Sequence, residues 1–197
     1  MKKMKMEEYG AEEARSYSKH TAMFSFLYRP ILKDFEKLEV RGRLLEVGCG
    51  PGILAVKIAQ KFEVEITAID ISESMIEVAE ENIKKANLEG KIKLEVGDVH
   101  DENFVARLGK FDCVYSTFSL HHWENPVKAL NNLYSVLEDG MIYILDARKI
   151  WVGFIGVKPY SEAYTIGELK DIIKKTEFRS FEVNKRFPGL VSVVLRK

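Results

Sequence analysis

The sequence predicts an α/β fold: a doubly wound sheet of about seven strands, mostly parallel with an antiparallel last strand, plus N-terminal capping helices. Three observations predict it. Short apolar runs alternate with helical segments from residue 43 onward, a glycine-rich turn follows the first run, and two strand-like runs joined by Pro188-Gly189 close the chain. Near-continuous apolar strands separated by helices are typical of a parallel sheet that is covered on both faces.

The N-terminal stretch, residues 7–38, reads as two helices. We expect a boundary between them near Pro30, because the residue before a proline is pushed out of helical geometry. These helices are expected to cap the carboxyl ends of the strands.

Strands and helices then alternate in chain order. Apolar runs predict strands at 43–47, 64–70, 91–96, 111–116 and 141–147. Helical patterns predict helices at 52–61, 73–86, 102–108 and 126–137, of which the third is a short helix or a loop. A helix at 166–176 precedes a hairpin of 178–187 and 190–197, so we expect the last strand to run antiparallel to the rest.

Composition and charge argue against several classes of function, although a local basic patch stays possible. Lysine plus arginine and aspartate plus glutamate both number 30, so the net charge is zero. Nucleic acid is therefore not expected as the main partner, since phosphate binding usually leaves a basic excess. No stretch approaches the ~18 apolar residues of a membrane span, and the basic start lacks the apolar region of a signal peptide. Cys49 and Cys113 lie inside apolar runs, which indicates buried thiols and a cytoplasmic location.

The glycine-rich turn lies in "LLEVGCGPGIL", residues 44–54, with glycine at positions 48, 50 and 52. In doubly wound sheets, ligands bind outside the carboxyl ends of the strands, and glycines there let a ligand approach backbone amides. Because Ile53 occupies the last position of the dinucleotide fingerprint GxGxxG, that motif is absent, and no GK[ST] ending marks a phosphate loop. A turn that only packs tightly is the alternative.

Acidic residues close the first three predicted strands. Glu46 precedes the turn, and an acid there suits an ammonium group but would repel phosphates. Asp70 ends the second strand, where a carboxylate can accept both ribose hydroxyls, and Asp98 ends the third, where it could meet a base amine. The alternatives are a helix N-cap for Asp70, which Ser72 can supply instead, and a turn-forming role for Asp98.

Four segments, "LLEVGCGPG", "ITAIDIS", "LEVGDVHD" and "FDCVYSTFSLHHW", occur in the order and spacing of a known family. They resemble the class I S-adenosylmethionine-dependent methyltransferases, especially the small-molecule enzymes of the ubiquinone/menaquinone-biosynthesis-like (methyltransferase type 11) family. The resemblance is strong over 44–146 and implies a Rossmann-like single domain over 1–197. Its parts would be an N-terminal helical cap (1–40), a cofactor-binding core (41–147), and a substrate loop, helix and C-terminal hairpin (148–197).

The resemblance also implies S-adenosyl-L-methionine as cofactor and S-adenosyl-L-homocysteine as product. Asp70 would hold the ribose hydroxyls, Asp98 the adenine amine, and Glu46 the methionine part. The cofactor-binding residues that it implies are Tyr17, Glu46, Gly48, Cys49, Gly50, Asp70, Ile71, Met75, Asp98, Val99, Ser116, Thr117 and Phe118. For Met75 and Val99, ordinary core packing is the alternative.

Methyl transfer is an in-line displacement, so alignment and exclusion of water are the main tasks of the protein. A base is needed only if the acceptor arrives protonated, and the candidates are His121 and His122 in "LHHWEN", with one expected to point inward. Tyr17 is the third candidate catalytic residue, expected near the sulfonium or carboxylate. A structural histidine pair and a core tyrosine are the alternatives. No metal site is expected, because no further ligands complete a set.

The acceptor is expected to be a small molecule. The segment after the strand at 141–147 is rich in aromatic residues, namely Trp151, Phe154, Tyr160 and Tyr164. This suggests a loop over an apolar acceptor pocket, and an irregular core segment is the alternative. The alternatives to a small-molecule enzyme are a non-catalytic S-adenosylmethionine-binding module and an RNA or protein methyltransferase. A nicotinamide dehydrogenase is disfavoured by the glycine spacing.

Overall fold

A computed structural model describes residues 10, 14–16, 18, 28–149, 163–186 and 189–197. The chain divides into two compact units, Met1–Asp98 and Val99–Lys197. The strand order of the sheet is β3-β2-β1-β4-β5-β7-β6. The predicted seven-stranded, doubly wound fold is therefore confirmed.

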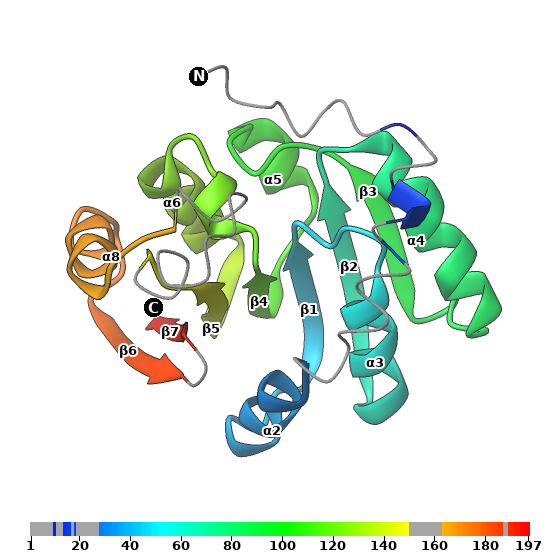
Figure 1. The fold of residues 1–197 in the computed structure, drawn as a ribbon, viewed down its shortest axis with the longest axis horizontal. Helices are drawn as coiled ribbons and strands as arrows, with labels where there is room; N and C mark the ends of the chain where they lie inside the picture. The colour runs from blue at the N-terminus through cyan, green and yellow to red at the C-terminus, as the bar shows by residue number, and fades with distance from the viewer. Residues whose placement is uncertain (1–9, 11–13, 17, 19–27, 150–162, 187–188) are drawn as a thin grey trace. The chain divides into compact units, whose positions relative to one another are not determined.

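The first unit contains three parallel strands, β1 (Gly42–Val47), β2 (Val64–Asp70) and β3 (Ile92–Val96), shown in blue to green in Figure 1. Their bounds agree with the predicted strands to within one residue. Because the strands are parallel, their carboxyl ends lie at one edge of this part of the sheet.

Three helices of the first unit are α2 (Arg29–Lys37), α3 (Ile53–Lys61) and α4 (Glu73–Lys85). The helix α2 begins at Arg29 and has Pro30 in its first turn, in agreement with a helix start near that proline. The helix predicted before it lies mostly outside the described residues, so the boundary between the two stays a prediction. The hydroxyl of Ser72 caps α4 by accepting a hydrogen bond from the backbone N–H of Met75 at 3.4 Å. Local sequence signals thus define where these helices start.

The helix α2 contacts the end of α3. The rings of Phe35 and Phe62 lie 6.3 Å apart, and Lys61 Nζ is 2.7 Å from Glu36 Oε1. Since Phe62 closely precedes β2, α2 lies near the start of that strand, whereas we expected it near the carboxyl ends.

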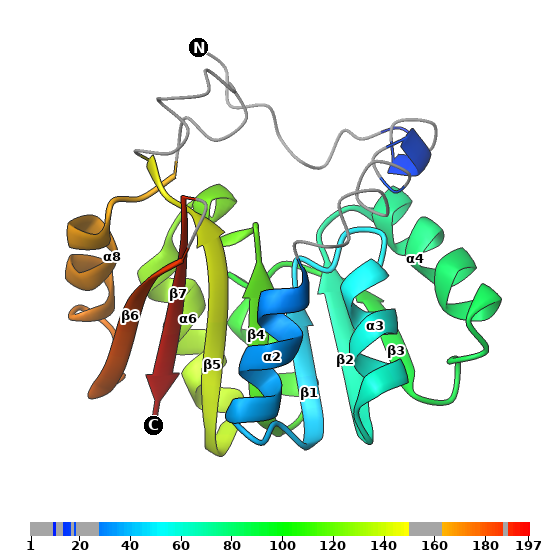
Figure 2. The same ribbon diagram turned by 60° about the horizontal axis from the view of Figure 1, so that its bottom comes forward.

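The second unit contains β4 (Phe111–Thr117), β5 (Leu137–Ala147), β6 (Ser180–Arg186) and β7 (Leu190–Arg196). The strand β5 is parallel to β4, and β7 is antiparallel to both β5 and β6, as the opposed arrows of β5 and β7 in Figure 2 show. The predicted antiparallel last strand is confirmed.

The strand β5 begins four residues earlier than predicted, at Leu137 rather than Met141. The intervening Glu138, Asp139 and Gly140 read as a turn, yet they continue the strand through a register shift between β4 and β5. A Cβ on Gly140 would lie 1.8 Å from the carbonyl oxygen of Asp112, so only glycine fits there.

The described part of the second unit contains the helices α5 (Glu102–Arg107), α6 (Pro126–Val136) and α8 (Ile166–Ile173) and the short 3-10 helix η3 (Leu120–His122). Side chains cap three of them: Asp101 caps α5, Asn125 caps α6, and Thr165 forms a capping box with Glu168 in α8. Within the described residues, no helix has both the length and the apolar character that crossing a bilayer requires.

Candidate active site

The glycine turn connects β1 to α3 and takes a backbone conformation that favours glycine. The φ angles of Gly48, Gly50 and Gly52 are 73°, 51° and 70°. The N–H groups of Gly48 and Cys49 both donate to the carbonyl of Ile69, at 2.9 and 3.0 Å. The backbone therefore requires these glycines whether or not a ligand approaches them.

Close packing against α4 is a second reason for glycine at position 52. A Cβ at this position would lie 3.0 Å from the Cβ of Ala79 in α4. The tight-packing alternative thus holds for Gly52, the only one of the three glycines that we did not assign to the cofactor.

Asp70 anchors the glycine turn from the end of β2. Its Oδ2 accepts from the N–H of Gly50 at 2.8 Å, and its Oδ1 accepts from the N–H of Ser72 at 3.0 Å. Burial raises the pKa of Asp70, while hydrogen bonds from the Ser72 and Gly50 amides oppose that rise. An ionised carboxylate can accept about four hydrogen bonds, so sites for a ligand are left. This anchoring role was not predicted; the helix cap belongs to Ser72, as expected.

Two buried carboxyl groups flank the turn. Glu46 in β1 is 2% exposed and Asp70 is 4% exposed. Burial, and then the charges of Asp70 and Glu46, raise the pKa of Cys49 well above its usual value. The Cys49 thiol therefore stays protonated, and the electrostatic environment of the turn favours a cation over an anion.

The remaining predicted residues of the first unit lie around the same strand ends. Ile71 and Asp98 are half-buried, and Met75 is buried in the first turn of α4. The N–H of Gly97, next to Asp98, donates to the backbone carbonyl of Asp70 at 2.9 Å. The ends of β2 and β3 are thus joined where the two aspartates lie.

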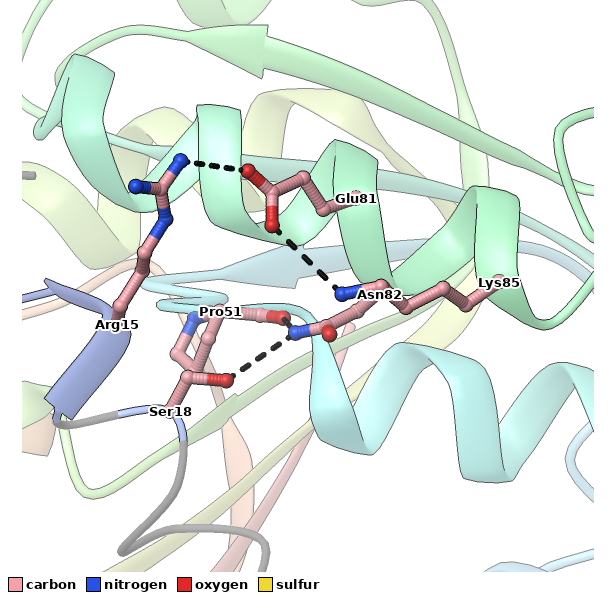
Figure 3. Close-up of polar contacts among 6 residues, drawn as sticks. All are labelled: Arg15, Ser18, Pro51, Glu81, Asn82 and Lys85. Atoms are coloured by element: carbon pink, nitrogen blue, oxygen red, sulfur yellow. Dashed lines mark hydrogen bonds and ion pairs between the residues drawn. The ribbon is translucent and has the colours of Figure 1, made fainter.

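Tyr17 lies outside the described residues, but neighbours on either side of it are described. Ala14 is fully buried and clusters with Met75 and Val78 of α4. Figure 3 shows Arg15 paired with Glu81 at 2.9 Å and Ser18 hydrogen-bonded to Asn82 at 3.2 Å. The N-terminal segment therefore contacts α4 along the stretch that also carries Met75. Sequence reasoning missed Asn82 completely.

In the second unit, the end of β4 holds the next predicted residues. Ser116 is buried, while Thr117 and Phe118 are half-buried. Phe118 has a φ of 53°, a conformation that costs a residue with a β-carbon about 1–2 kcal/mol. Its N–H donates to the carbonyl of Leu145 at 2.9 Å, which holds this bend in place. Such strained positions cluster at functional sites.

Val99 is buried, and its carbonyl oxygen accepts a hydrogen bond from the Asn132 side-chain amide at 2.9 Å. The amide thus ties the segment after Asp98 to α6.

The two adjacent histidines differ in environment. His121 is 3% exposed, and its Nδ1 lies 2.7 Å from Asp146 Oδ1. The backbone N–H of His121 donates to Asp146 Oδ2 at 3.1 Å. His122 is exposed, with its ring centroid 3.9 Å from that of His121. A carboxylate at Nδ1 holds the proton on that nitrogen, so Asp146 orients the ring and fixes its tautomer.

The segment of aromatic residues falls mostly outside the described residues: Trp151, Phe154 and Tyr160 are not among them. Tyr164 is half-buried, and its carbonyl oxygen accepts from the N–H of Lys149 at 3.3 Å. Among the described residues, no group of three or more histidine, cysteine, aspartate or glutamate residues could hold a metal ion.

Comparisons with known proteins match this chain to methyltransferases. A family model described as "Methyltransferase domain" matches residues 44–140. A demethylmenaquinone methyltransferase of Leptospira interrogans is 27% identical over 153 residues, covering 72% of this chain and 61% of the relative. The 27-O-demethylrifamycin SV methyltransferase of Amycolatopsis mediterranei is 31% identical, and the match covers 52% of this chain and 37% of that enzyme. The chain thus spans less than two thirds of the length of these curated relatives.

Solved structures show the same fold. A candidate S-adenosyl-L-methionine-dependent methyltransferase of Methanococcus maripaludis has a TM-score of 0.81 at 22% identity, covering 100% of this chain and 97% of that one. A methyltransferase of Aquifex aeolicus has a TM-score of 0.73 at 19% identity, covering 95% and 98%.

The sheet order, the glycine turn and the match to the methyltransferase domain model make this chain similar to the class I S-adenosylmethionine-dependent methyltransferases. More particularly, the chain is similar to enzymes of the ubiquinone/menaquinone type, which confirms the resemblance drawn from its motifs.

Proposed function

We propose that this protein transfers a methyl group from S-adenosylmethionine to a small-molecule acceptor by in-line displacement. The observation that carries the proposal is the glycine turn between two buried carboxyl groups, Glu46 and Asp70. The methionine end of this cofactor bears an ammonium and a sulfonium, which suit such a site. A pyrophosphate would be repelled there.

The proposed cofactor contacts follow from the strand ends of the first unit. The turn of Gly48, Cys49 and Gly50 would receive the methionine part beside Glu46. The two Asp70 oxygens already accept from backbone amides, so their remaining lone pairs would accept the ribose hydroxyls. Adenine would contact Ile71 and Met75, with its amine near Asp98. Further residues proposed to contact the cofactor are Tyr17, Val99, Ser116, Thr117 and Phe118.

The cofactor supplies a methyl group activated by its sulfonium: the acceptor forms a bond to the methyl carbon, and the carbon–sulfur bond breaks with its electron pair going to sulfur. The protein aligns the acceptor and excludes water, which can contribute about 7–11 kcal/mol. If the acceptor arrives protonated, His121 is the proposed base. Asp146 at Nδ1 would stabilise the ring when Nε2 takes the proton.

The acceptor class is proposed from the relatives and from the charge of the chain. The relatives' names describe quinone and rifamycin substrates, both of them small molecules. The net charge of zero gives no support to a nucleic acid partner. A cytoplasmic location is also proposed, supported by two cysteines that are both buried and unpaired.

Binding and transfer are tested separately. Calorimetry with S-adenosylhomocysteine and with NAD should show binding of the first only, and Asp70→Asn should weaken it while Glu77→Gln, an exposed change on α4, should not. Transfer of labelled methyl to a demethylmenaquinone, then to a mixture of phenols and amines, would identify the acceptor class. Tight binding with no transfer to any acceptor would favour a non-catalytic binding module, and binding of NAD alone would overturn the proposal.

A further inference from the structure

Asn82, on the second half of α4, contacts two segments that are far apart in the sequence (Figure 3). Its side-chain Nδ2 lies 2.9 Å from the carbonyl oxygen of Pro51 and 3.2 Å from Ser18 Oγ. A carboxamide nitrogen carries two hydrogens, so one group can serve both acceptors at once.

Pro51 belongs to the glycine turn, between Gly50 and Gly52. On one side of it, Asp70 Oδ2 holds the N–H of Gly50 at 2.8 Å, and on the other Gly52 packs on Ala79. Ala79 and Asn82 are three residues apart and so lie on one face of α4. The turn is therefore fixed at consecutive residues, by a carboxylate from β2 and by an amide from α4.

Three of the described residues of the N-terminal segment contact the same helix. Ala14 packs with Met75, Arg15 pairs with Glu81 at 2.9 Å, and Ser18 accepts from Asn82. The Arg15–Glu81 pair is largely exposed, and pairs of this kind contribute little by themselves. The Ser18–Asn82 hydrogen bond differs from this ion pair, because the same Asn82 amide also donates to the Pro51 carbonyl in the glycine turn.

We propose that Asn82 is a positioning residue that couples the N-terminal segment to the cofactor turn. The Ser18 hydroxyl holds the Asn82 amide in the orientation that reaches Pro51, and the amide in turn fixes the turn in its binding conformation. The coupling rests on the proposed function, namely that this turn binds S-adenosylmethionine.

The first test measures the affinity for S-adenosylhomocysteine by calorimetry in wild type, Ser18→Ala, Asn82→Ala and the double variant. Each single change should weaken binding about fivefold, the worth of one net hydrogen bond. In the Asn82→Ala background, Ser18→Ala should have no further effect, because both act through one amide. If Ser18→Ala weakened S-adenosylhomocysteine binding by the same factor in the wild-type and the Asn82→Ala proteins, the coupling would be overturned. The control is Glu80→Ala, an exposed position on the same helix.

An isosteric variant separates hydrogen bonding from space filling. Asn82→Asp keeps the shape but sets a carboxylate against the Pro51 carbonyl and removes both donors. It should bind S-adenosylhomocysteine more weakly than Asn82→Ala does. Affinity equal to that of wild type would exclude a role for the amide hydrogens.

A second measurement needs no ligand: the rate of tryptic cleavage after Arg15. Ser18→Ala and Asn82→Ala should both speed this cleavage, and Glu80→Ala should leave it unchanged. If wild type fails to bind S-adenosylhomocysteine, the proposed function fails and the coupling with it. If wild type binds but neither Ser18→Ala nor Asn82→Ala changes the affinity, the coupling alone fails.

Discussion

At the scale of single residues, the glycine turn owes its sequence first to backbone conformation. Positive φ angles at Gly48, Gly50 and Gly52 exclude most side chains before any ligand is considered. A bulky replacement such as Gly48→Val would therefore strain the fold as well as the site. Asp70 likewise has two roles, one structural and one proposed. Its carboxylate accepts a hydrogen bond from the Gly50 amide, and the same carboxylate is proposed to bind the ribose hydroxyls.

The conformational demand can be measured at Gly52. Gly52→Ala should lower the free energy of unfolding by about 1–2 kcal/mol, because a β-carbon is disfavoured at positive φ; it would also lie 3.0 Å from Ala79 Cβ. Gly90→Ala is the control, since a β-carbon there meets nothing within 4 Å. Urea unfolding of both variants provides the comparison, and equal stabilities would contradict this account of the turn.

The histidine pair provides a second prediction at this scale. His121→Asn should lower kcat at least about 100-fold, the lower end for a general base, with S-adenosylhomocysteine affinity kept within threefold. His122→Ala should leave kcat nearly unchanged, because His122 is exposed and His121 is the residue paired with Asp146. Melting temperatures supply the check: a loss of kcat that follows a loss of folded protein would assign His121 a structural role.

At the scale of elements, helix caps and apolar runs made most of the fold predictable. Proline in the first turn of α2 and Ser72 before α4 define helix starts from neighbouring residues alone. The early part of β5 was missed, because Glu138, Asp139 and Gly140 resemble a turn and join the strand only through pairing with β4.

Contacts between distant residues could not be predicted from one sequence. The Asp146 partner of His121 is 25 residues away, and the Pro51 partner of Asn82 is 31 residues away. Neither pair carries a periodicity or a local motif, since a single amide or carboxylate can face any neighbour that the fold provides. The family motifs therefore yield a prediction of the candidate site residues, whereas the long-range contacts that hold those residues in place could not be predicted.

The capping box of α8 gives a pH-dependent prediction. Hydrogen bonds from the backbone N–H and side chain of Thr165 lower the pKa of Glu168. A carboxyl pKa lowered by folding stabilises the protein above the unfolded value, and this stabilisation is lost as pH falls through the folded value. The difference in unfolding free energy between wild type and Glu168→Ala should therefore shrink as pH falls below about 4.3, the usual glutamate pKa. Chemical unfolding at a series of pH values between neutral and acid would show it, and a constant difference would contradict it.

At the scale of the whole molecule, each compact unit contains one buried cysteine, Cys49 in the first and Cys113 in the second. Burial raises the pKa of Cys113 to about 12 and that of Cys49 well above its usual value. Thiolates are the reactive form, so both side chains should be inert in the folded protein.

Thiol labelling therefore reports opening of each unit separately. At pH 8 the native protein should react with a disulfide reagent many times more slowly than the protein in denaturant. Peptide mass spectrometry would identify which cysteine reacts first under native conditions. Saturating S-adenosylhomocysteine should slow labelling of Cys49, since it stabilises the unit that contains the proposed turn. Rapid reaction of either cysteine in the native state would contradict the buried environment.

The hydrogen bond from the N–H of Lys149 to the carbonyl of Tyr164 has a use in protein engineering. This bond holds the residues on either side of the intervening aromatic-rich stretch close together. The preceding residue, Arg148, donates its backbone N–H to the Gly189 carbonyl at 2.9 Å. A stretch anchored at adjacent ends can be exchanged as a cassette, because a graft has only to reproduce the short distance between its ends. Exchanging this stretch for that of a relative with a different acceptor, and measuring which acceptor is then methylated, would test the prediction that the stretch lies over an acceptor pocket.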